Sequence, residues 1–299
     1  MKDKNESPIT NHQSPTQIKK PNLFNYISAI IRAFGFVVFA LIFAVAMIPV
    51  RGGSRFGVRA LSFFMKGLIW FSGSKIVVHG KISDARPLLI VANHISVFEI
   101  GAGPAVFGNS FFSKKEMRSW PLIGWISAKF GVQFIDRNPA TALQGLKQIR
   151  DEMARVSWPI IIFPEGTTTN GSHVLPFKSA MFNFMEISCD IEGQHMGGCT
   201  VQPIVWVFRK RDGSKLSDED LAYNFAWFDS RKQKEGPLNP PSMPDGRGLI
   251  AQVLHVFAVG GMLIEAHVLP VPNLQGICDR KELAASLGKI VSDEYMRLK

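Results

Sequence analysis

The hydrophobic and polar positions divide the chain into a polar start, two apolar stretches and a long region of alternating short elements. Residues 1–22 are rich in Lys, Asn, Ser, Gln and Pro, which predicts a disordered tail. They lack the pattern of a cleaved signal peptide, so we expect none. Residues 23–73 are expected to form two membrane-docking helices, and residues 74–299 one further domain.

The first apolar stretch, Ala33–Val50, contains no charged residue. Its length is at the lower limit for crossing the roughly 30 Å hydrocarbon core of a bilayer, and Arg32 before it could extend to the headgroups. A buried core helix is the alternative, which the lack of a polar face disfavours. Cations flank the stretch on both sides, so charge does not decide whether it crosses or re-enters.

The second apolar stretch, Phe56–Phe71, differs from the first because it carries cations. Arg55, Arg59 and Lys66 fall within a narrow arc when the segment is drawn as a helix. A basic stripe on an otherwise apolar helix is typical of a helix that lies in the headgroup plane of a membrane.

From Ser74 onward, short apolar runs alternate with segments of helical spacing. Strands are expected at Ile76–His79, Pro87–Ala92, Val132–Ile135, Pro159–Phe163, Val201–Val207 and Leu263–Val268. Helices are expected at residues 140–156, 178–188, 249–258 and 280–297. Continuous apolar runs suit strands that are covered on both faces, so we predict an α/β fold with a central, mostly parallel sheet flanked by helices. Residues 209–248 are charged and then rich in Pro and Gly, which predicts a surface excursion.

Composition favours a lipid partner. The chain is 46% hydrophobic with a net charge of +10, which suits polyanions, and the apolar segments favour anionic lipid over nucleic acid. No interleaving of aromatic and basic residues supports nucleic-acid binding. The three cysteines form no C-x-x-C pair, which indicates a reduced compartment and no cysteine zinc site.

A histidine and an acid follow the second predicted strand. His94 lies where Pro87–Ala92 ends, and Glu99 follows it by five residues. Catalytic groups in open α/β sheets gather beyond the carboxyl ends of strands. If His94 lies in the turn and Glu99 in the first turn of the next helix, the acid can orient the imidazole as a general base. A structural histidine that caps a helix is the alternative.

A second group of polar residues follows the strand Pro159–Phe163. Glu165, Gly166 and Thr167 offer backbone N–H groups and polar side chains for a hydroxyl, a phosphate or an oxyanion. A polar turn with a helix cap is the alternative reading.

Cations are candidates for binding a phosphate. Arg137 follows the strand Val132–Ile135, where its guanidinium could make bidentate contacts, unless it pairs with Asp136. Four more cations could extend this surface or remain solvated: Lys114, Lys115, Arg118 and Lys178.

These blocks resemble, in the same order, the motifs of the glycerolipid acyltransferase family, which includes 1-acylglycerol-3-phosphate acyltransferases. The motifs are Asn-His-x4-Asp, Phe-Ile-Asp-Arg, Phe-Pro-Glu-Gly-Thr and Val-x-Pro-Ile/Val. The chain carries them at Asn93–Glu99, Phe134–Arg137, Phe163–Thr167 and Val201–Ile204, within roughly residues 75–210. The two N-terminal apolar segments are also similar to the family's membrane-docking portion.

The resemblance implies an O-acyltransferase that moves a fatty acyl chain from an acyl thioester to the free hydroxyl of a lysolipid. The first expected acceptor is 1-acylglycerol-3-phosphate, which gives phosphatidic acid. By motif match, His94 would be the general base, Glu99 its partner and Arg137 a phosphate ligand. Glu165 and Gly166 would bind the acceptor, and Thr167 in the same turn is a further candidate substrate ligand.

Two positions depart from the family pattern. Glu99 replaces the usual aspartate, and its extra methylene moves the carboxylate by about 1.5 Å. In Phe177–Ala180, Lys178 keeps the lysine of the Phe-Lys-x-Gly pattern, which implies a substrate contact, but Ala180 replaces the glycine.

No cofactor is expected besides acyl-CoA or acyl-carrier protein as co-substrate. The chain has no Gly-x-Ser-x-Gly motif, so we expect no serine acyl-enzyme. We expect no metal site, because the remaining histidines are scattered: His12, His79, His173, His195, His255 and His267. The resemblance implies a place in the cell inner membrane with the catalytic domain facing the cytoplasm.

Two other functions remain open from sequence. The acceptor could be a lyso-ornithine lipid, which has no phosphate, and the altered Phe-Lys-x-Gly block leaves room for this. From another class, the chain could be an inactive, membrane-attached lipid-binding protein, in which Glu99 marks the loss of activity.

Overall fold

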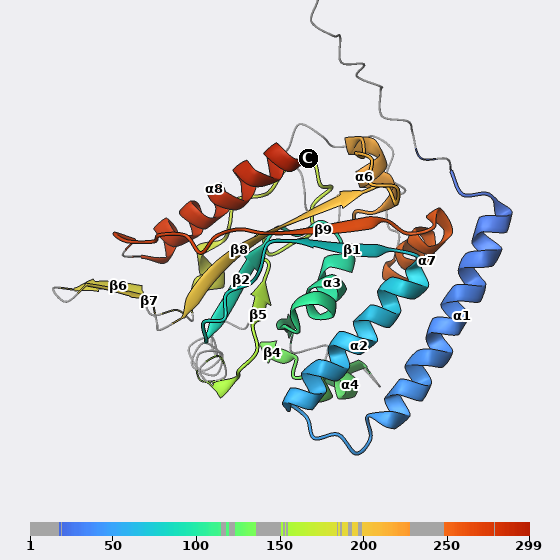
Figure 1. The fold of residues 1–299 in the computed structure, drawn as a ribbon, viewed down its shortest axis with the longest axis horizontal. Helices are drawn as coiled ribbons and strands as arrows, with labels where there is room; N and C mark the ends of the chain where they lie inside the picture. Colours follow the sequence, from blue (N-terminus) through green and yellow to red (C-terminus); the bar gives the residue numbers. More distant parts are fainter. Residues whose placement is uncertain are drawn as a thin grey trace, which may run out of the picture.

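A computed structural model of the chain shows a seven-stranded sheet flanked by helices (Figure 1). The structure describes residues 18, 20–114, 118–119, 123–135, 151, 153, 155–183, 185, 187–190, 193–196, 199–227, 248–277 and 279–299. The sheet strands are β1 (Lys75–His79), β2 (Leu88–Ala92), β3 (Ser110–Lys114), β4 (Gln133–Ile135), β5 (Ile160–Ile162), β8 (Thr200–Arg209) and β9 (Leu263–Val268). Their order across the sheet is β1-β9-β8-β2-β5-β3-β4.

The direction of the strands changes once across this sheet. Neighbouring strands from β8 to β4 are parallel, whereas β9 runs antiparallel to β8, and β1 is parallel to β9. This confirms the predicted α/β fold with a mostly parallel sheet. Every residue of β2 and β5 is buried, as their continuous apolar sequences predict.

Helices cover both faces of the sheet. The helices of the main body are α3 (Phe98–Phe107), α4 (Ile123–Lys129), α6 (Asp218–Asn224), α7 (Leu249–Val259) and α8 (Arg280–Leu298). On β8, Trp206 meets Phe107 of α3, with ring centroids 6.1 Å apart, and Arg209 donates to the Leu298 carbonyl at the end of α8. Residues 206 and 209 point to opposite faces of a strand, so α3 and α8 lie on opposite sides.

The two N-terminal helices are present and lie side by side (Figure 1). α1 (Leu23–Ala46) begins well before the predicted Ala33, because Asn22 and Asn25 form a reciprocal capping box. α1 is long and apolar enough to cross a membrane by length and composition, and little of it is buried. α2 (Arg55–Ser72) matches the second predicted segment, with Ser54 as its N-cap.

The side chain of Arg32 does not extend to the headgroups as the sequence suggested. Its guanidinium does not extend away from the protein but donates to the carbonyls of Ser72 and Phe257, the former at 3.4 Å. These carbonyls lie at the end of α2 and in the last turn of α7, where the helix dipoles favour a cation. α1 is therefore bonded to the main body.

Other boundaries also differ. The predicted helix at 178–188 is wrong, since the segment forms the short 3-10 helix η3 (Ser179–Phe182) and then enters the hairpin β6 (Ile187–Asp190) and β7 (Gly193–Met196).

α6 interrupts the predicted excursion at 209–248, of which residues 228–247 lie outside the described part. Most of the predicted tail, and residues 140–150 of the predicted helix 140–156, also lie outside it, but the Ile18 N–H bonds the Asp220 carboxylate at 3.2 Å.

Candidate active site

The segment that carries His94 is fixed at the carboxyl end of β2. The preceding Asn93 is buried and bridges to β8, donating to the Trp206 carbonyl at 3.0 Å and accepting from the Trp206 N–H at 2.8 Å. The His94 carbonyl accepts from the Thr169 N–H at 2.9 Å. The backbone around His94 is thus bonded to two other segments of the chain.

His94 and Glu99 meet as predicted. His94 Nδ1 lies 2.8 Å from Glu99 Oε1, with Glu99 in the first turn of α3. Glu99 is fully buried, and the His94 side chain is 14% exposed. The same Oε1 accepts the N–H groups of Ile95 and Ser96, at 2.6 and 2.7 Å. Because Oε1 already accepts two N–H groups, it acts as an acceptor toward the ring as well, so the imidazole donates from Nδ1 and a neutral ring has its lone pair at Nε2.

The extra methylene of Glu99 therefore does not prevent the contact. Its Oε1 reaches the imidazole and both backbone donors, while Oε2 has no hydrogen-bond partner among the described residues. The ring of His94 also stacks on Phe163 at the end of β5, with centroids 4.3 Å apart and an interplanar angle of 22°. Carboxylate and aromatic ring together hold the orientation of the imidazole.

Glu165 supports the same histidine from the neighbouring strand end. Its Oε1 accepts the His94 N–H at 2.6 Å and its Oε2 accepts the Leu175 N–H at 2.8 Å. The side chain is 1% exposed. Burial raises the pKa of Glu165 to about 8, against the lowering effects of these two N–H groups and the Lys178 ammonium. The sequence did not predict this bridging role, although an acid directly after a buried strand requires buried partners.

The raised pKa of Glu165 predicts how the stability of the fold depends on pH. A carboxyl whose pKa is raised from 4.5 to about 8 holds a proton in the folded state that the unfolded chain has released. Stability should therefore fall as pH rises through that interval. We expect the Tm of the wild type to decrease between pH 6 and 9, and that of Glu165→Gln to decrease less. Parallel Tm profiles of the two proteins would contradict the assignment.

The other predicted ligands share this turn. Gly166 adopts φ +69°, and a Cβ built there would lie 2.9 Å from Lys178 Nζ, so Lys178 passes directly over the glycine. Thr167 is partly exposed beside them. The structure thus brings His94, Glu99 and this turn together at one sheet edge. Arg137, Asp136 and Lys115 lie outside the described residues, as does the side chain of Lys114, and Arg118 is exposed.

Comparison with known proteins identifies the family of the chain. A family model described as Acyltransferase matches residues 75–207. A lyso-ornithine lipid O-acyltransferase from Rhizobium meliloti is 31% identical over 229 residues, which cover 74% of this chain and 70% of that protein. The chain belongs to the acyltransferase family. The matched residues 75–207 include every predicted site residue of the acyltransferase.

Other relatives match shorter parts. A 1-acyl-sn-glycerol-3-phosphate acyltransferase from Neisseria gonorrhoeae is 36% identical over 95 residues, 32% of this chain and 37% of that protein. A lyso-ornithine lipid O-acyltransferase from Pseudomonas aeruginosa is 35% identical over 142 residues, 46% of this chain and 51% of that protein. The acyltransferase thus spans about a third to a half of the length of these relatives.

A solved structure shares the fold of the acyltransferase. The 1-acyl-sn-glycerophosphate acyltransferase from Thermotoga maritima matches with a TM-score of 0.56 at 15% identity, over 93% of this chain and 97% of that chain. The match therefore includes the N-terminal helices. The roles of the individual site residues in the reaction remain predictions.

Proposed function

We propose that this acyltransferase moves a fatty acyl chain from an acyl thioester to the free hydroxyl of a lysolipid, with His94 as the general base. The observation that carries the proposal is the 2.8 Å contact between His94 Nδ1 and the buried Glu99 carboxylate. Family membership supports the reaction class, and this contact favours the tautomer in which Nε2 carries the lone pair that a base requires.

The proposed reaction needs no covalent enzyme intermediate. His94 Nε2 takes the proton from the lysolipid hydroxyl while that oxygen attacks the thioester carbonyl. The tetrahedral intermediate then collapses, the C–S bond breaks, and the proton on His94 passes to the leaving thiolate. Products are the acylated lipid and the free thiol, and Glu99 stabilises the imidazolium between the two steps.

An oxyanion donor is expected in the turn after β5. The N–H of Gly166 already donates to the Phe163 carbonyl at 3.0 Å, so it is not available in this conformation. The N–H of Thr167, which has no partner among the described residues, is the next candidate. Lys178 beside it would add positive charge for the acceptor head group.

We propose a membrane location, the inner membrane with the catalytic domain toward the cytoplasm. Large apolar side chains are exposed on α1, including Phe34 and Ile42, and on α2, where Trp70 is 72% exposed. The α2 cations are exposed as well, which suits anionic headgroups: Arg55, Arg59 and Lys66. The thioester donor would be acyl-CoA or acyl-carrier protein.

Two acceptors are candidates, and one assay separates them. 1-Acylglycerol-3-phosphate is the first, because the net charge of +10 and Lys178 suit a phosphate. A lyso-ornithine lipid is the second, because the Rhizobium meliloti relative matches over 70% of its length.

The purified protein should be given each acceptor with a labelled acyl donor. We expect labelled phosphatidic acid at a kcat/KM at least tenfold above that for the lyso-ornithine lipid. Turnover on the lyso-ornithine lipid alone would reverse this assignment and leave the acyl-transfer mechanism standing. Failure on both acceptors would contradict the mechanism as well.

A further inference from the structure

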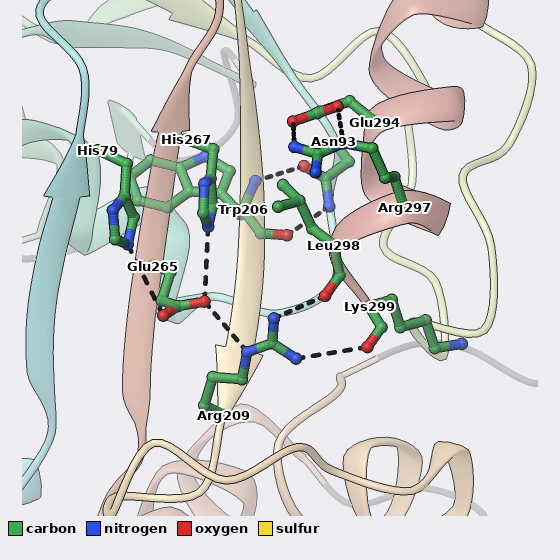
Figure 2. A network of polar contacts seen from close by, with 10 residues as sticks. All are labelled: His79, Asn93, Trp206, Arg209, Glu265, His267, Glu294, Arg297, Leu298 and Lys299. Atoms are coloured by element: carbon green, nitrogen blue, oxygen red, sulfur yellow. Dashed lines mark hydrogen bonds and ion pairs between the residues drawn. The ribbon is translucent and has the colours of Figure 1, made fainter. Parts of the chain in front are cut away.

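A second cluster of polar side chains lies on β1 and β9, which are separated from β2 and His94 by β8. These two strands pair in parallel, with His79 directly beside His267. Glu265 precedes His267 by two residues and therefore points to the same face of the sheet. Figure 2 shows the two imidazoles and the carboxylate converging on one point.

The distances in this cluster are those between ligands of one metal ion. His79 Nε2 lies 3.7 Å from Glu265 Oε1, and His267 Nε2 lies 3.5 Å from Glu265 Oε2. One ligand atom from each residue lies within 4.8 Å of the others. Bonds of about 2.1 Å at a tetrahedral zinc ion place its ligand atoms about 3.4 Å apart, so the carboxylate already lies near ligand distance from both rings, and the imidazole rings would tilt out of their stacked arrangement for both planes to meet the ion.

Neighbouring contacts position all three side chains. The imidazole rings of His79 and His267 stack with centroids 4.3 Å apart at 14°, which holds the two rings against each other on one face of the sheet. Arg209 Nε donates to Glu265 Oε2 at 3.1 Å, which fixes the carboxylate and leaves Oε1 toward His79. Hydrogen-bonded carboxylates of this kind are typical of metal ligands.

The cluster is open to solvent and connected to α8. The His79 side chain is 48% exposed, which allows a metal ion to enter and a water molecule to complete its coordination. Arg209 also donates to the carbonyls of Leu298 and Lys299, so the arginine joins the cluster to the end of α8 (Figure 2). An ion bound here would strengthen the attachment of that helix to the sheet.

We propose that His79, Glu265 and His267 form a binding site for Zn²⁺ that stabilises the edge of the sheet and the end of α8. Two imidazole nitrogens and one carboxylate oxygen are a ligand set that zinc accepts, with the fourth position left to water. The Arg209 cation close by lowers the affinity by repulsion, and the Glu265 charge offsets it.

The test is calorimetric titration of Zn²⁺ alone into the untagged, detergent-solubilised full chain after removal of metals with a chelator. We expect one Zn²⁺ per chain and an affinity at least ten times lower in His79→Ala and in His267→Ala. His173→Ala is the matched control, because His173 bonds Ser172 and lies outside the cluster, and it should bind like the wild type.

Two further readouts address folding and geometry. Because the His79 side chain is exposed, His79→Ala should fold like the wild type. Zn²⁺ should raise the Tm of the wild type but not of this variant. Co²⁺ should give tetrahedral d–d absorption in the wild type and lose it in His267→Ala. No saturable zinc binding by the wild type, or equal binding by wild type and His79→Ala, would overturn the proposal. In that case the cluster is only an ion pair beside two stacked rings.

Discussion

Replacing His94 by alanine is expected to lower kcat about 10²–10⁴-fold, the range for loss of a positioned general base. In the proposed mechanism this ring, 2.8 Å from Glu99, is the base, and no covalent step on the enzyme compensates for its loss. The Tm should fall only slightly, because the variant keeps the His94 backbone bonds to Glu165 and Thr169. The measurement is kcat for acylation of the preferred lysolipid at saturating substrate, compared between His94→Ala and the wild type.

His173→Ala is the control for this variant, since it removes an imidazole elsewhere in the same domain and should retain wild-type turnover. Added imidazole is expected to restore part of the activity of His94→Ala, because the variant leaves a ring-sized space on Phe163. Wild-type turnover by His94→Ala would refute the mechanism. A wild type that binds lysolipid without acylating it would instead support the inactive lipid-binding protein.

Changes at Glu99 are expected to have the second largest effect. Glu99→Gln keeps the size of the side chain but removes the charge that fixes the tautomer of His94, so kcat should fall about 10²–10⁴-fold. Glu99→Asp shortens the reach by about 1.5 Å, which moves the carboxylate out of range of His94 Nδ1 unless α3 shifts. We expect its activity to fall as well, although aspartate is the usual residue of the family.

Measurements of unfolding separate the two roles of Glu99, which are to orient His94 and to accept the backbone N–H groups of the turn before α3. Glu99→Ala leaves the N–H groups of Ile95 and Ser96 without their acceptor, which should cost about 1–3 kcal/mol for each group. Glu99→Gln keeps an acceptor oxygen and should unfold at a Tm closer to that of the wild type. The measurement is chemical or thermal unfolding beside the kcat assay. Near wild-type turnover by Glu99→Gln would show that the acid only holds the turn that precedes α3.

The predicted elements that the structure confirms are those with strong periodicity or continuous apolar sequence. Residues 88–92 and 160–162 are apolar throughout, and only a strand buried on both faces suits such short runs. The helix predicted at 178–188 failed for a specific reason. Phe182 and Met185 have helical spacing and are both buried, but one 3-10 turn followed by a strand places them in the core equally well.

The site shows what local sequence can and cannot reveal. His94 and Glu99 are five residues apart, so their contact depended only on where one helix begins, and the sequence was sufficient to predict it. The bridge from Glu165 to the His94 N–H joins different strands, and its signal was only a buried acid after an apolar run.

The cluster on β1 and β9 was hidden from sequence analysis for the same reason. His79 and His267 lie at opposite ends of the main domain in sequence, and only the pairing of the two strands brings them together. The expectation of no metal site rested on spacing along the chain, which does not detect ligands from two strands.

The hydrogen bonds of Arg32 decide how the N-terminal helix can behave at a lipid surface. A helix bonded to the end of α2 and the last turn of α7 cannot act as a flexible tether, because any rotation of α1 would break contacts within the main body. In the proposed membrane location, the catalytic edge would therefore keep a fixed height relative to the apolar face of α1. Lysolipids would then reach this height by lateral diffusion, and a lipid whose hydroxyl lies at another depth would be a poorer substrate.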